Sequence, residues 1–258
     1  MDIEKYLNRI NYEGKLIPTI EVLKELQKNH LLNVPFENLD IHYNNPIDLD
    51  REKFYHKIVE RKRGGFCYEL NGLFCDLLRE IGFDSKMISA RVYDNGKEDF
   101  GREFDHMAII VTIDQILYLV DVGFGEFTFY PLKIEINTIQ SDPRGNFVIE
   151  EYESDYYKVS KEENGAKSIE YIFTLKERDL CEFEGMCIYH QTSSNSHFTE
   201  KKIISKPTEK GRITISGNTL KITEGAIVKT NKEFSSGEYN HVLLNWFGID
   251  ENQIKANY

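Results

Sequence analysis

Cys67 is the residue of this sequence best placed for nucleophilic chemistry. It follows Arg63-Gly-Gly-Phe66 and opens a segment whose apolar residues recur at helical spacing. The first backbone N–H groups of a helix have no partner within it, and the helix macrodipole places about half a positive charge there. Both effects favour a thiolate over a thiol, as a nucleophilic cysteine requires. The alternative is that Cys67 is a small buried side chain that only fills space.

His106 is a candidate base for that thiol, and Asp121 is its candidate partner. Strand-like residues 107–113 and 116–123 flank Asp114-Gln115. If those two residues form a hairpin turn, His106 and Asp121 share a face as diagonal neighbours, ~7–8 Å apart at the backbone. A carboxylate that accepts one imidazole N–H fixes the tautomer and stabilises the imidazolium. A slip of one residue in register would separate the pair, and the alternative is then an ordinary surface or core histidine.

The remaining cysteines and histidines offer no second catalytic site. Cys75, Cys181 and Cys187 are predicted to be structural, and all four cysteines are expected to be reduced. The sequence has no CxxC pair and no cysteine–histidine cluster at zinc-ligand spacing, so no metal is expected. The other histidines fall on charged helical faces or have no acidic partner at a defined register: His30, His42, His56, His190, His197 and His241.

The composition is that of an acidic globular protein. The 258 residues are 40% hydrophobic and carry a net charge of −11, which is enough apolar material for a core and excludes overall disorder. The acidic total disfavours nonspecific binding to nucleic acid or to an anionic membrane. The apolar runs are far shorter than the about 20 residues of a membrane-spanning helix. The first residues lack the apolar stretch of a secretory signal, so we expect a cytoplasmic protein.

The candidate residues must be positioned by helices in the first third of the chain and by strands after it. The clearest helix begins at Cys67, carries an apolar stripe over residues 66–81 and ends at Gly82. A last helix is predicted over residues 239–247. Elements that do not alternate along the chain indicate an α+β fold. Strands are predicted over residues 86–93, 107–113, 117–122, 156–160, 169–175, 198–205, 212–216 and 219–223.

Five motifs resemble, in order, those of the arylamine N-acetyltransferase family. The segment Arg63-Gly-Gly-Phe-Cys-Tyr-Glu-Leu-Asn71 resembles its active-site signature. The other four are Val34-Pro-Phe-Glu-Asn-Leu-Asp-Ile41, His106 before a strand, Val120-Asp-Val-Gly-Phe-Gly125 after it, and Asn195-Ser-His-Phe-Thr199. Any one of them alone is weak, but five in order are a specific signal.

The resemblance implies an α+β fold on a scaffold related to that of the cysteine proteases. Its first part is an N-terminal helical bundle that carries the nucleophile, over residues 1–84. A central antiparallel β-barrel that carries the histidine and the aspartate follows over residues 85–190. A C-terminal α/β lid covers residues 191–258.

The resemblance also implies a chemistry. Cys67, His106 and Asp121 would form a triad that moves an acetyl group from the co-substrate acetyl-CoA to an aromatic amine, hydrazine or hydroxylamine. The cycle is ping-pong and passes through acetyl-Cys67, without a metal, nucleic-acid or membrane partner. Glu37 and Arg63 form a candidate ion pair that would hold the segment before Cys67, although two surface charges are the alternative.

Binding residues are implied as well. Phe36 and Phe124 are expected to line a pocket for a flat aromatic acceptor. The family's CoA contacts, just before the triad histidine and in the lid strands, imply that Arg102, Glu103, Gly217 and Thr219 bind the cofactor. The basic residues that could hold the CoA phosphates are Arg102, Lys206, Lys210 and Arg212.

Two other classes of protein stay open. The same triad on the same scaffold can hydrolyse peptides or cross-link glutamine, so a thiol peptidase or transglutaminase-like enzyme is the second hypothesis. A binding module with a silent triad is the third. The intact cysteine, histidine and aspartate disfavour that third hypothesis, and the flanking motifs favour acyl transfer.

Overall fold

The computed structural model describes residues 1–163 and 165–255. Its N-terminal part consists of helices packed against α5 (Cys67–Ile81). The predicted apolar stripe of α5 is confirmed, because Leu70, Phe74 and Leu77 are fully buried. Gly82 ends the helix at a φ of 103°, a left-handed conformation that glycine adopts without strain. The other helices are α1 (Ile3–Arg9), α2 (Ile20–Asn33), α3 (Leu39–His42) and α4 (Arg51–Tyr55), which continues into a π-helical turn (His56–Glu60).

The segment after α5 forms an almost closed antiparallel barrel. Its strands are β2 (Asp84–Asp94), β3 (Asp99–Phe100), β4 (His106–Ile113), β5 (Ile116–Val120), β6 (Leu132–Lys133), β7 (Ile139–Asp142), β8 (Gly145–Glu151), β9 (Tyr157–Glu163) and β10 (Ala166–Phe173). They pair in the order β6-β5-β4-β2-β10-β9-β8-β7, and β3 pairs with β2. A side chain joins the two ends: the Gln140 amide donates to and accepts from the Lys133 backbone, each over 2.8 Å.

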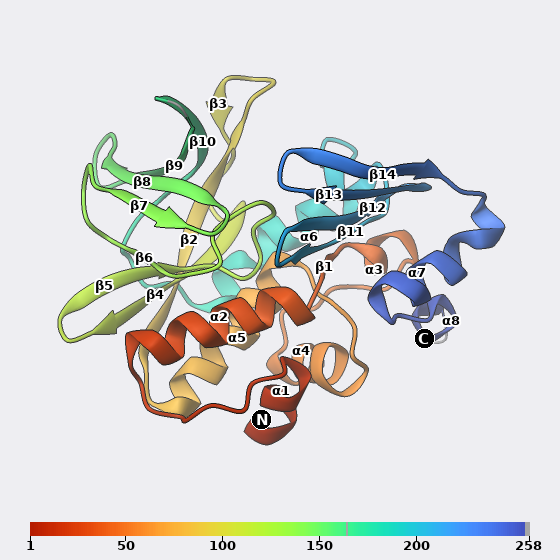
Figure 1. Ribbon diagram of the computed structural model, residues 1–258, viewed down its shortest axis with the longest axis horizontal. Coiled ribbons are helices and arrows are strands. Elements are labelled where there is room, and N and C mark those ends of the chain that lie inside the picture. The colour runs from red at the N-terminus through yellow and green to blue at the C-terminus, as the bar shows by residue number, and fades with distance from the viewer. Residues whose placement is uncertain (164, 256–258) are drawn as a thin grey trace.

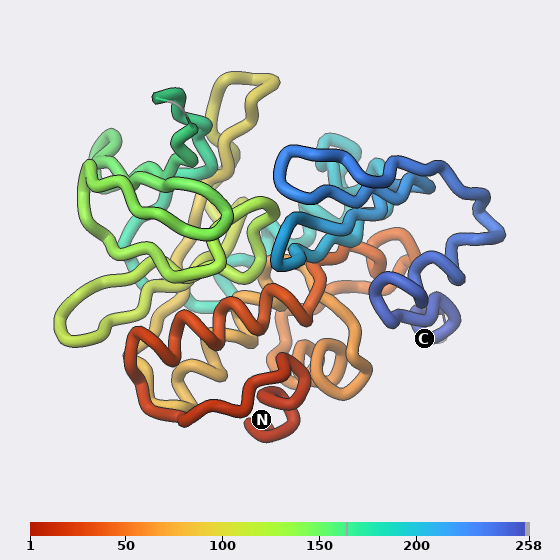
Figure 2. Tube along the Cα trace, viewed as in Figure 1, coloured from red at the N-terminus to blue at the C-terminus, as the bar shows by residue number. Residues whose placement is uncertain are grey.

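A second antiparallel sheet, the lid sheet, lies beside the barrel (Figure 1). Its order is β1 (Phe36–Glu37), β11 (Ile203–Thr208), β12 (Gly211–Ser216), β13 (Thr219–Glu224) and β14 (Ile227–Glu233). Phe36 pairs with Ser205, so a strand from the helical region forms the edge of the C-terminal sheet. Helices α7 (Tyr239–Phe247) and α8 (Glu251–Lys255) complete this region and end near the helical bundle, as the trace in Figure 2 shows.

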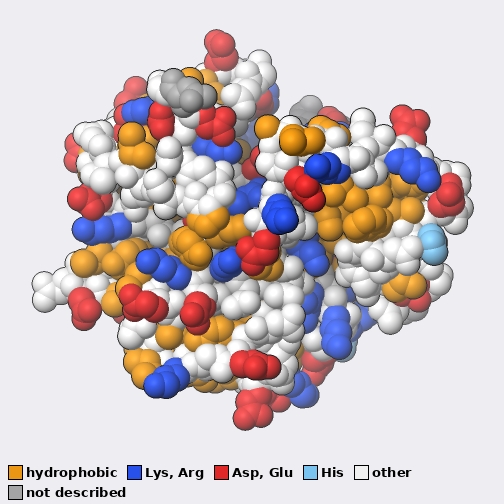
Figure 3. Space-filling view, viewed as in Figure 1, with side chains coloured by type: hydrophobic (Ala, Val, Ile, Leu, Met, Phe, Trp, Pro, Cys, Tyr) orange, Lys and Arg blue, Asp and Glu red, His pale blue; other side chains and the backbone are white. Residues whose placement is uncertain are grey.

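Three apolar clusters form the core: one between the helices and one face of the barrel strands, one on the other face of those strands, and one under the lid sheet. Helix α6 (Glu184–Thr192) connects the barrel to the lid sheet. The surface is hollowed between the barrel and the lid sheet, with Lys and Arg side chains along the groove (Figure 3). Among the helices that the structure describes, none has the length and apolarity that would let it cross a membrane.

The predicted α+β architecture is confirmed, and the structure differs from the predictions in local details. The strand predicted over residues 198–205 begins at Ile203, after a 3₁₀ turn (His197–Thr199). Strand β14 was not predicted, because its side chains are almost all exposed and show no apolar alternation. The boundary predicted at residue 190 falls inside α6, which buries only Cys187 and His190 and therefore lacks an apolar stripe.

Candidate active site

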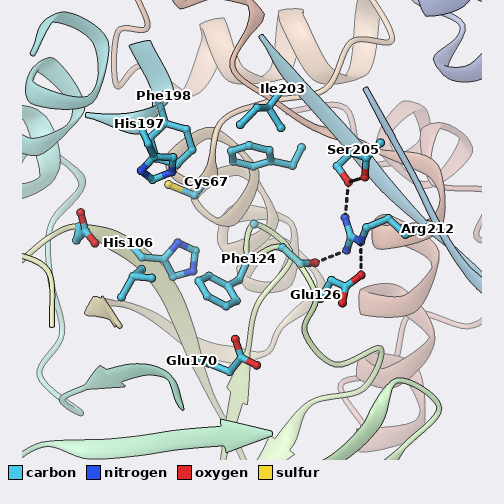
Figure 4. A pocket seen from close by; sticks show the side chains of 16 residues that line it. Cys67, His106, Phe124, Glu126, Glu170, His197, Phe198, Ile203, Ser205 and Arg212 are labelled. Atoms are coloured by element: carbon cyan, nitrogen blue, oxygen red, sulfur yellow. Dashed lines mark hydrogen bonds and ion pairs between the residues drawn. The ribbon is translucent and has the colours of Figure 1, made fainter. Parts of the chain in front are cut away.

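A cavity of about 460 Å³ opens where the three groups of elements meet (Figure 4). Side chains from all three line it, so no single region of the chain forms it alone. The residues that matter for its chemistry are Phe36 and Cys67 from the helical region, His106 and Phe124 from the barrel, and Phe198 and Arg212 from the C-terminal part.

Cys67 is the first residue of α5, and its side chain faces this cavity. The start of the helix is fixed by Glu69, whose Oε2 accepts from the Phe66 backbone N–H over 2.8 Å. Burial raises the pKa of the Cys67 thiol, and a hydrogen bond from the Tyr68 N–H lowers it only in part. Burial thus outweighs the helix start, contrary to the expectation from position alone. A thiolate here needs an adjacent cation, which protonated His106 can supply.

The hairpin register places His106 beside Asp121, as predicted. Ile109 pairs with Val120, and the turn residues Asp114-Gln115 both have positive φ, 49° and 65°, as a type I′ turn requires. His106 Nε2 lies 2.7 Å from Asp121 Oδ2, and both side chains are buried. Because Nε2 is bound to the carboxylate, Nδ1 is the nitrogen left to exchange a proton with the thiol.

The Asp121 carboxylate is held by further hydrogen bonds. Its Oδ1 accepts from the backbone N–H groups of Gly123, over 2.9 Å, and Phe124, over 3.0 Å. Its Oδ2 accepts from the Tyr171 hydroxyl over 3.2 Å, in addition to His106. A carboxylate with this many donors keeps one orientation. Sequence reasoning missed Tyr171, which is 50 residues away along the chain.

Asn71 joins the helix of the nucleophile to the histidine and the aspartate. Its Nδ2 donates to Met107 O, over 2.6 Å, and to Asp121 Oδ1, over 2.9 Å. Its Oδ1 accepts from the Val122 N–H over 2.9 Å. The close approach also needs Gly123, because a Cβ there would lie 2.9 Å from Cys67 Cα. The sequence signal that could have identified Asn71 is its spacing of four residues from Cys67, which places both on one face of the helix.

A buried ionic cluster holds the turn before Cys67. Arg63 Nη2 donates to Glu37 Oε1 and Arg63 Nη1 to Asp40 Oδ1, each over 2.7 Å, so the predicted pairing of Glu37 and Arg63 is confirmed. Lys57 Nζ lies 2.7 Å from carboxylate oxygens of both Asp40 and Glu69. The cluster therefore ties β1, the π-helical turn and the first turn of α5 together.

Phe36 and Phe124 both line the cavity. The Phe36 ring packs on Phe66, with 5.6 Å between centroids. Phe124 packs edge-on against His106 and Tyr171, at 5.2 and 5.1 Å. Flat apolar walls of this kind suit an aromatic guest.

Arg102 lines a second cavity, of about 880 Å³. Its guanidinium stacks over the Tyr189 ring, 4.6 Å from the centroid. Val92, Asp105 and His197 line both cavities, so the two adjoin at the catalytic end of the barrel.

Glu103, Gly217 and Thr219, which are also expected to contact CoA, lie outside the linings of both cavities. The Glu103 carboxylate is engaged by Arg178, at 3.3 Å, and by the Tyr156 hydroxyl, at 2.7 Å. It therefore has partners within the protein, and its contact with CoA stays a prediction. Gly217 and Thr219 lie at the turn that joins β12 to β13, where Gly217 has a φ of 57°.

The structure corrects the predictions made for two of the remaining histidines. His190 Nε2 lies 3.2 Å from Asp105 Oδ1, and the sequence could not indicate this pair because its members belong to different elements. His30 is fully buried against the Tyr6 hydroxyl and does not lie on a charged face. All four cysteines are free. No group of three potential metal ligands occurs within residues 1–163 and 165–255.

Comparison with known proteins identifies the family. A family model described as N-acetyltransferase matches residues 19–255. Human arylamine N-acetyltransferase 1 is 32% identical, with 96% of this chain and 94% of that protein aligned. The Mycobacterium marinum arylamine N-acetyltransferase in complex with CoA is 28% identical, with a TM-score of 0.89 over 98% of this chain and 94% of that one.

A third similar protein is described with a glutamate in its triad. It is a Bacillus cereus arylamine N-acetyltransferase, described as having a unique Cys-His-Glu catalytic triad. It is 25% identical, with a TM-score of 0.89 over 97% of this chain and 99% of that one. With a family model matched over most of its length and a relative above 30% identity, the chain belongs to the arylamine N-acetyltransferase family.

Proposed function

We propose that this protein transfers an acetyl group from acetyl-CoA to an aromatic amine, hydrazine or hydroxylamine, and that Cys67, His106 and Asp121 carry out the transfer. The observation that carries the proposal is the buried contact of 2.7 Å between His106 Nε2 and Asp121 Oδ2, beside the cavity that Cys67 also lines. A cytoplasmic location is part of the proposal and is supported by the four free cysteines.

The first half-reaction acetylates the cysteine. The Cys67 proton moves to His106 Nδ1, and the thiolate attacks the thioester carbonyl of acetyl-CoA. A bond forms between Cys67 Sγ and the carbonyl carbon, the carbon–sulfur bond to CoA breaks, and CoA leaves with the proton from His106. The backbone N–H of Cys67, at the helix start, is the proposed donor to the oxyanion.

The second half-reaction transfers the acetyl group. The acceptor nitrogen attacks the carbonyl carbon of acetyl-Cys67 while His106 takes a proton from that nitrogen. The new carbon–nitrogen bond forms as the bond to Cys67 Sγ breaks, and the thiolate–imidazolium pair is restored. Asp121 stabilises the imidazolium in both steps. The Bacillus cereus relative is described with a glutamate as its third triad residue, which supports a carboxylate in this role here.

Two cavities that adjoin at Val92, Asp105 and His197, with Cys67 in the lining of the smaller one, support separate binding of the two substrates. We assign the acceptor to the smaller cavity, with its Phe36 and Phe124 walls. We assign acetyl-CoA to the larger cavity, with Arg102 as the candidate phosphate contact. The relative from Mycobacterium marinum is described in complex with CoA, which supports CoA as the acyl carrier here.

Mass spectrometry of the protein incubated with acetyl-CoA alone tests this function. One acetyl group is expected on the peptide that contains Cys67, and it should disappear when an arylamine is added. The Cys67→Ala variant should take up none, whereas Cys181→Ala, which removes an exposed cysteine, should behave as the wild type. Folded protein without acetylation at Cys67 would contradict the proposal and favour a silent binding site or a peptidase.

A further inference from the structure

Glu170 lies at an irregularity of the barrel next to the proposed site. On strand β10, Ile169 pairs with Ser160 and Tyr171 pairs with Val159, so the register shifts at Glu170 and leaves it opposite no residue. An extra residue of this kind is a β-bulge, which bends the strand and changes the direction of a side chain.

The bulge lets two consecutive side chains face the catalytic groups. In a regular strand, neighbouring residues point to opposite faces of the sheet. Here the Tyr171 hydroxyl donates to Asp121, while Glu170 lines the cavity of Cys67. In Figure 4 the Glu170 carboxylate lies on the side of His106 and Phe124 that is remote from Cys67.

Glu170 differs from the other carboxylates that line this cavity because it lacks a partner. Glu126 lies 3.7 Å from the Arg212 guanidinium, and Asp105 lies 3.2 Å from His190. Glu170 forms no hydrogen bond or salt bridge with any other residue whose placement the structure describes. A half-buried carboxylate without a partner carries a desolvation cost that a bound cation or N–H donor would offset.

We propose that Glu170 selects acceptors with a cationic, N–H-rich group at the end of the molecule opposite to the nucleophilic nitrogen. The inference rests on the proposed function, because the nucleophilic nitrogen must reach acetyl-Cys67. The aromatic ring then lies along Phe124, and a para substituent extends toward Glu170. An amidinium or guanidinium fits because its paired N–H groups match the two oxygens of a carboxylate.

The charge state of Glu170 gives this selectivity a pH dependence. Burial raises the pKa of Glu170 to about 7; Lys161 on β9 acts against the shift and Glu126 adds to it. His106 and Arg212 line the same cavity, but each has its own carboxylate partner. Because the pKa is raised, the carboxylate forms above about pH 7 and is neutralised below it, so the preference for a cation should grow as pH rises.

Three acceptors with the same ring and amine test the proposal: 4-aminobenzamidine, 4-aminobenzamide and 4-aminobenzoate. Their kcat/KM values are compared in wild type and in Glu170→Gln, which keeps the shape and removes the charge. We expect the substitution to lower kcat/KM roughly ten- to hundredfold for the amidine, the range of a hydrogen bond to a charged group. The value for the neutral amide should stay unchanged, and that for the benzoate should rise.

A pH comparison and a control variant show whether the effect is due to the charge of Glu170. In wild type the ratio of amidine to amide kcat/KM should rise between about pH 6 and about pH 8, and in Glu170→Gln it should stay flat. Glu151→Gln, which removes an exposed carboxylate of the same barrel, is the matched control and should resemble wild type.

Three results would overturn the assignment. The first is a ratio of amidine to amide kcat/KM that is the same in wild type and in Glu170→Gln. The second is a ratio in wild type that does not change with pH. The third is a loss of the amidine preference in Glu126→Gln but not in Glu170→Gln. Acetylation of Cys67 by acetyl-CoA precedes acceptor binding and is measured first. Its absence would refute the proposed function, whereas its presence with any of the three results would refute only the role of Glu170.

Discussion

The side-chain amide of Asn71 donates to the carboxylate of Asp121, with 2.9 Å between Nδ2 and Oδ1. Asn71 stands one helical turn after Cys67, the first residue of α5. One rigid helix therefore carries both the cysteine and the amide that binds the aspartate. The same side chain binds the backbone on both sides of the hairpin, at Met107 and Val122. We therefore regard Asn71 as a positioning residue for the whole triad.

Replacing Asn71 by Ala should lower both stability and turnover. It leaves the Met107 carbonyl and the Val122 N–H buried without partners, at about 1–3 kcal/mol each, and should lower Tm by several degrees. At temperatures well below Tm, kcat should still fall while the KM for acetyl-CoA stays the same. Calorimetry and steady-state kinetics measure both effects, with exposed Asn245→Ala as the control. A lower Tm with normal kcat would leave Asn71 a purely structural role.

Asp121→Asn and Asp121→Glu separate charge from shape at the third triad position. Burial raises the pKa of Cys67, and the His106 imidazolium acts against this rise. Asn cannot stabilise the imidazolium, so the rise is no longer opposed. The pH midpoint of Cys67 alkylation by iodoacetamide should move upward, and the rate near pH 7 should fall at least about tenfold. Glu should restore part of the rate. Equal alkylation of all four cysteines, or an unchanged rate in Asp121→Asn, would contradict the triad.

Removing one member of the buried ionic cluster should be costly. Glu37→Gln leaves Arg63 with one carboxylate fewer, and we expect the free energy of unfolding to fall by about 3–5 kcal/mol, as for other broken buried pairs. Glu163→Gln makes the same change in an exposed pair, where Lys161 lies at 2.9 Å, and should cost less than about 1 kcal/mol. Urea titrations measure both, and similar values for the two variants would show that burial does not strengthen the cluster.

Arg102→Ala tests the assignment of the larger cavity to acetyl-CoA. The loss of one guanidinium should raise the KM for acetyl-CoA severalfold, because Arg contributes charge-assisted hydrogen bonds to phosphate. The KM for the acceptor should not change. Glu103→Gln is the control for the neighbouring position, since its carboxylate is bound to Arg178 and Tyr156. A rise in KM for acetyl-CoA in Glu103→Gln alone would reverse the assignment.

Local signals predicted those contacts of the proposed triad that short segments determine. The two-residue turn at Asp114-Gln115 sets the hairpin register, and the register brings His106 to Asp121. The apolar stripe and Gly82 likewise define α5. Each of these features depends on residues close together in the chain, for which spacing alone is informative.

Other parts of the site depend on contacts that no local pattern encodes. Tyr171 and Glu170 reach the site through a bulge in a strand that follows Asp121 by about 50 residues, and the strand propensity of that segment is unaffected by the bulge. For a related reason, the helix start alone does not set the pKa of Cys67. Its burial is caused by segments packed from elsewhere in the chain, and burial outweighs the helix start.

The pairing of Phe36 with Ser205 has a consequence for how the protein becomes active during synthesis. Glu37, the next residue of β1, also binds Arg63 and so supports the turn that orients the nucleophile. Translation proceeds from the N-terminus, so Cys67 leaves the ribosome long before β11, the strand that pairs with β1, has been made. A nascent chain that ends before β11 therefore carries all three triad residues without a finished acceptor cavity. Reactivity of the thiol should therefore appear late in translation.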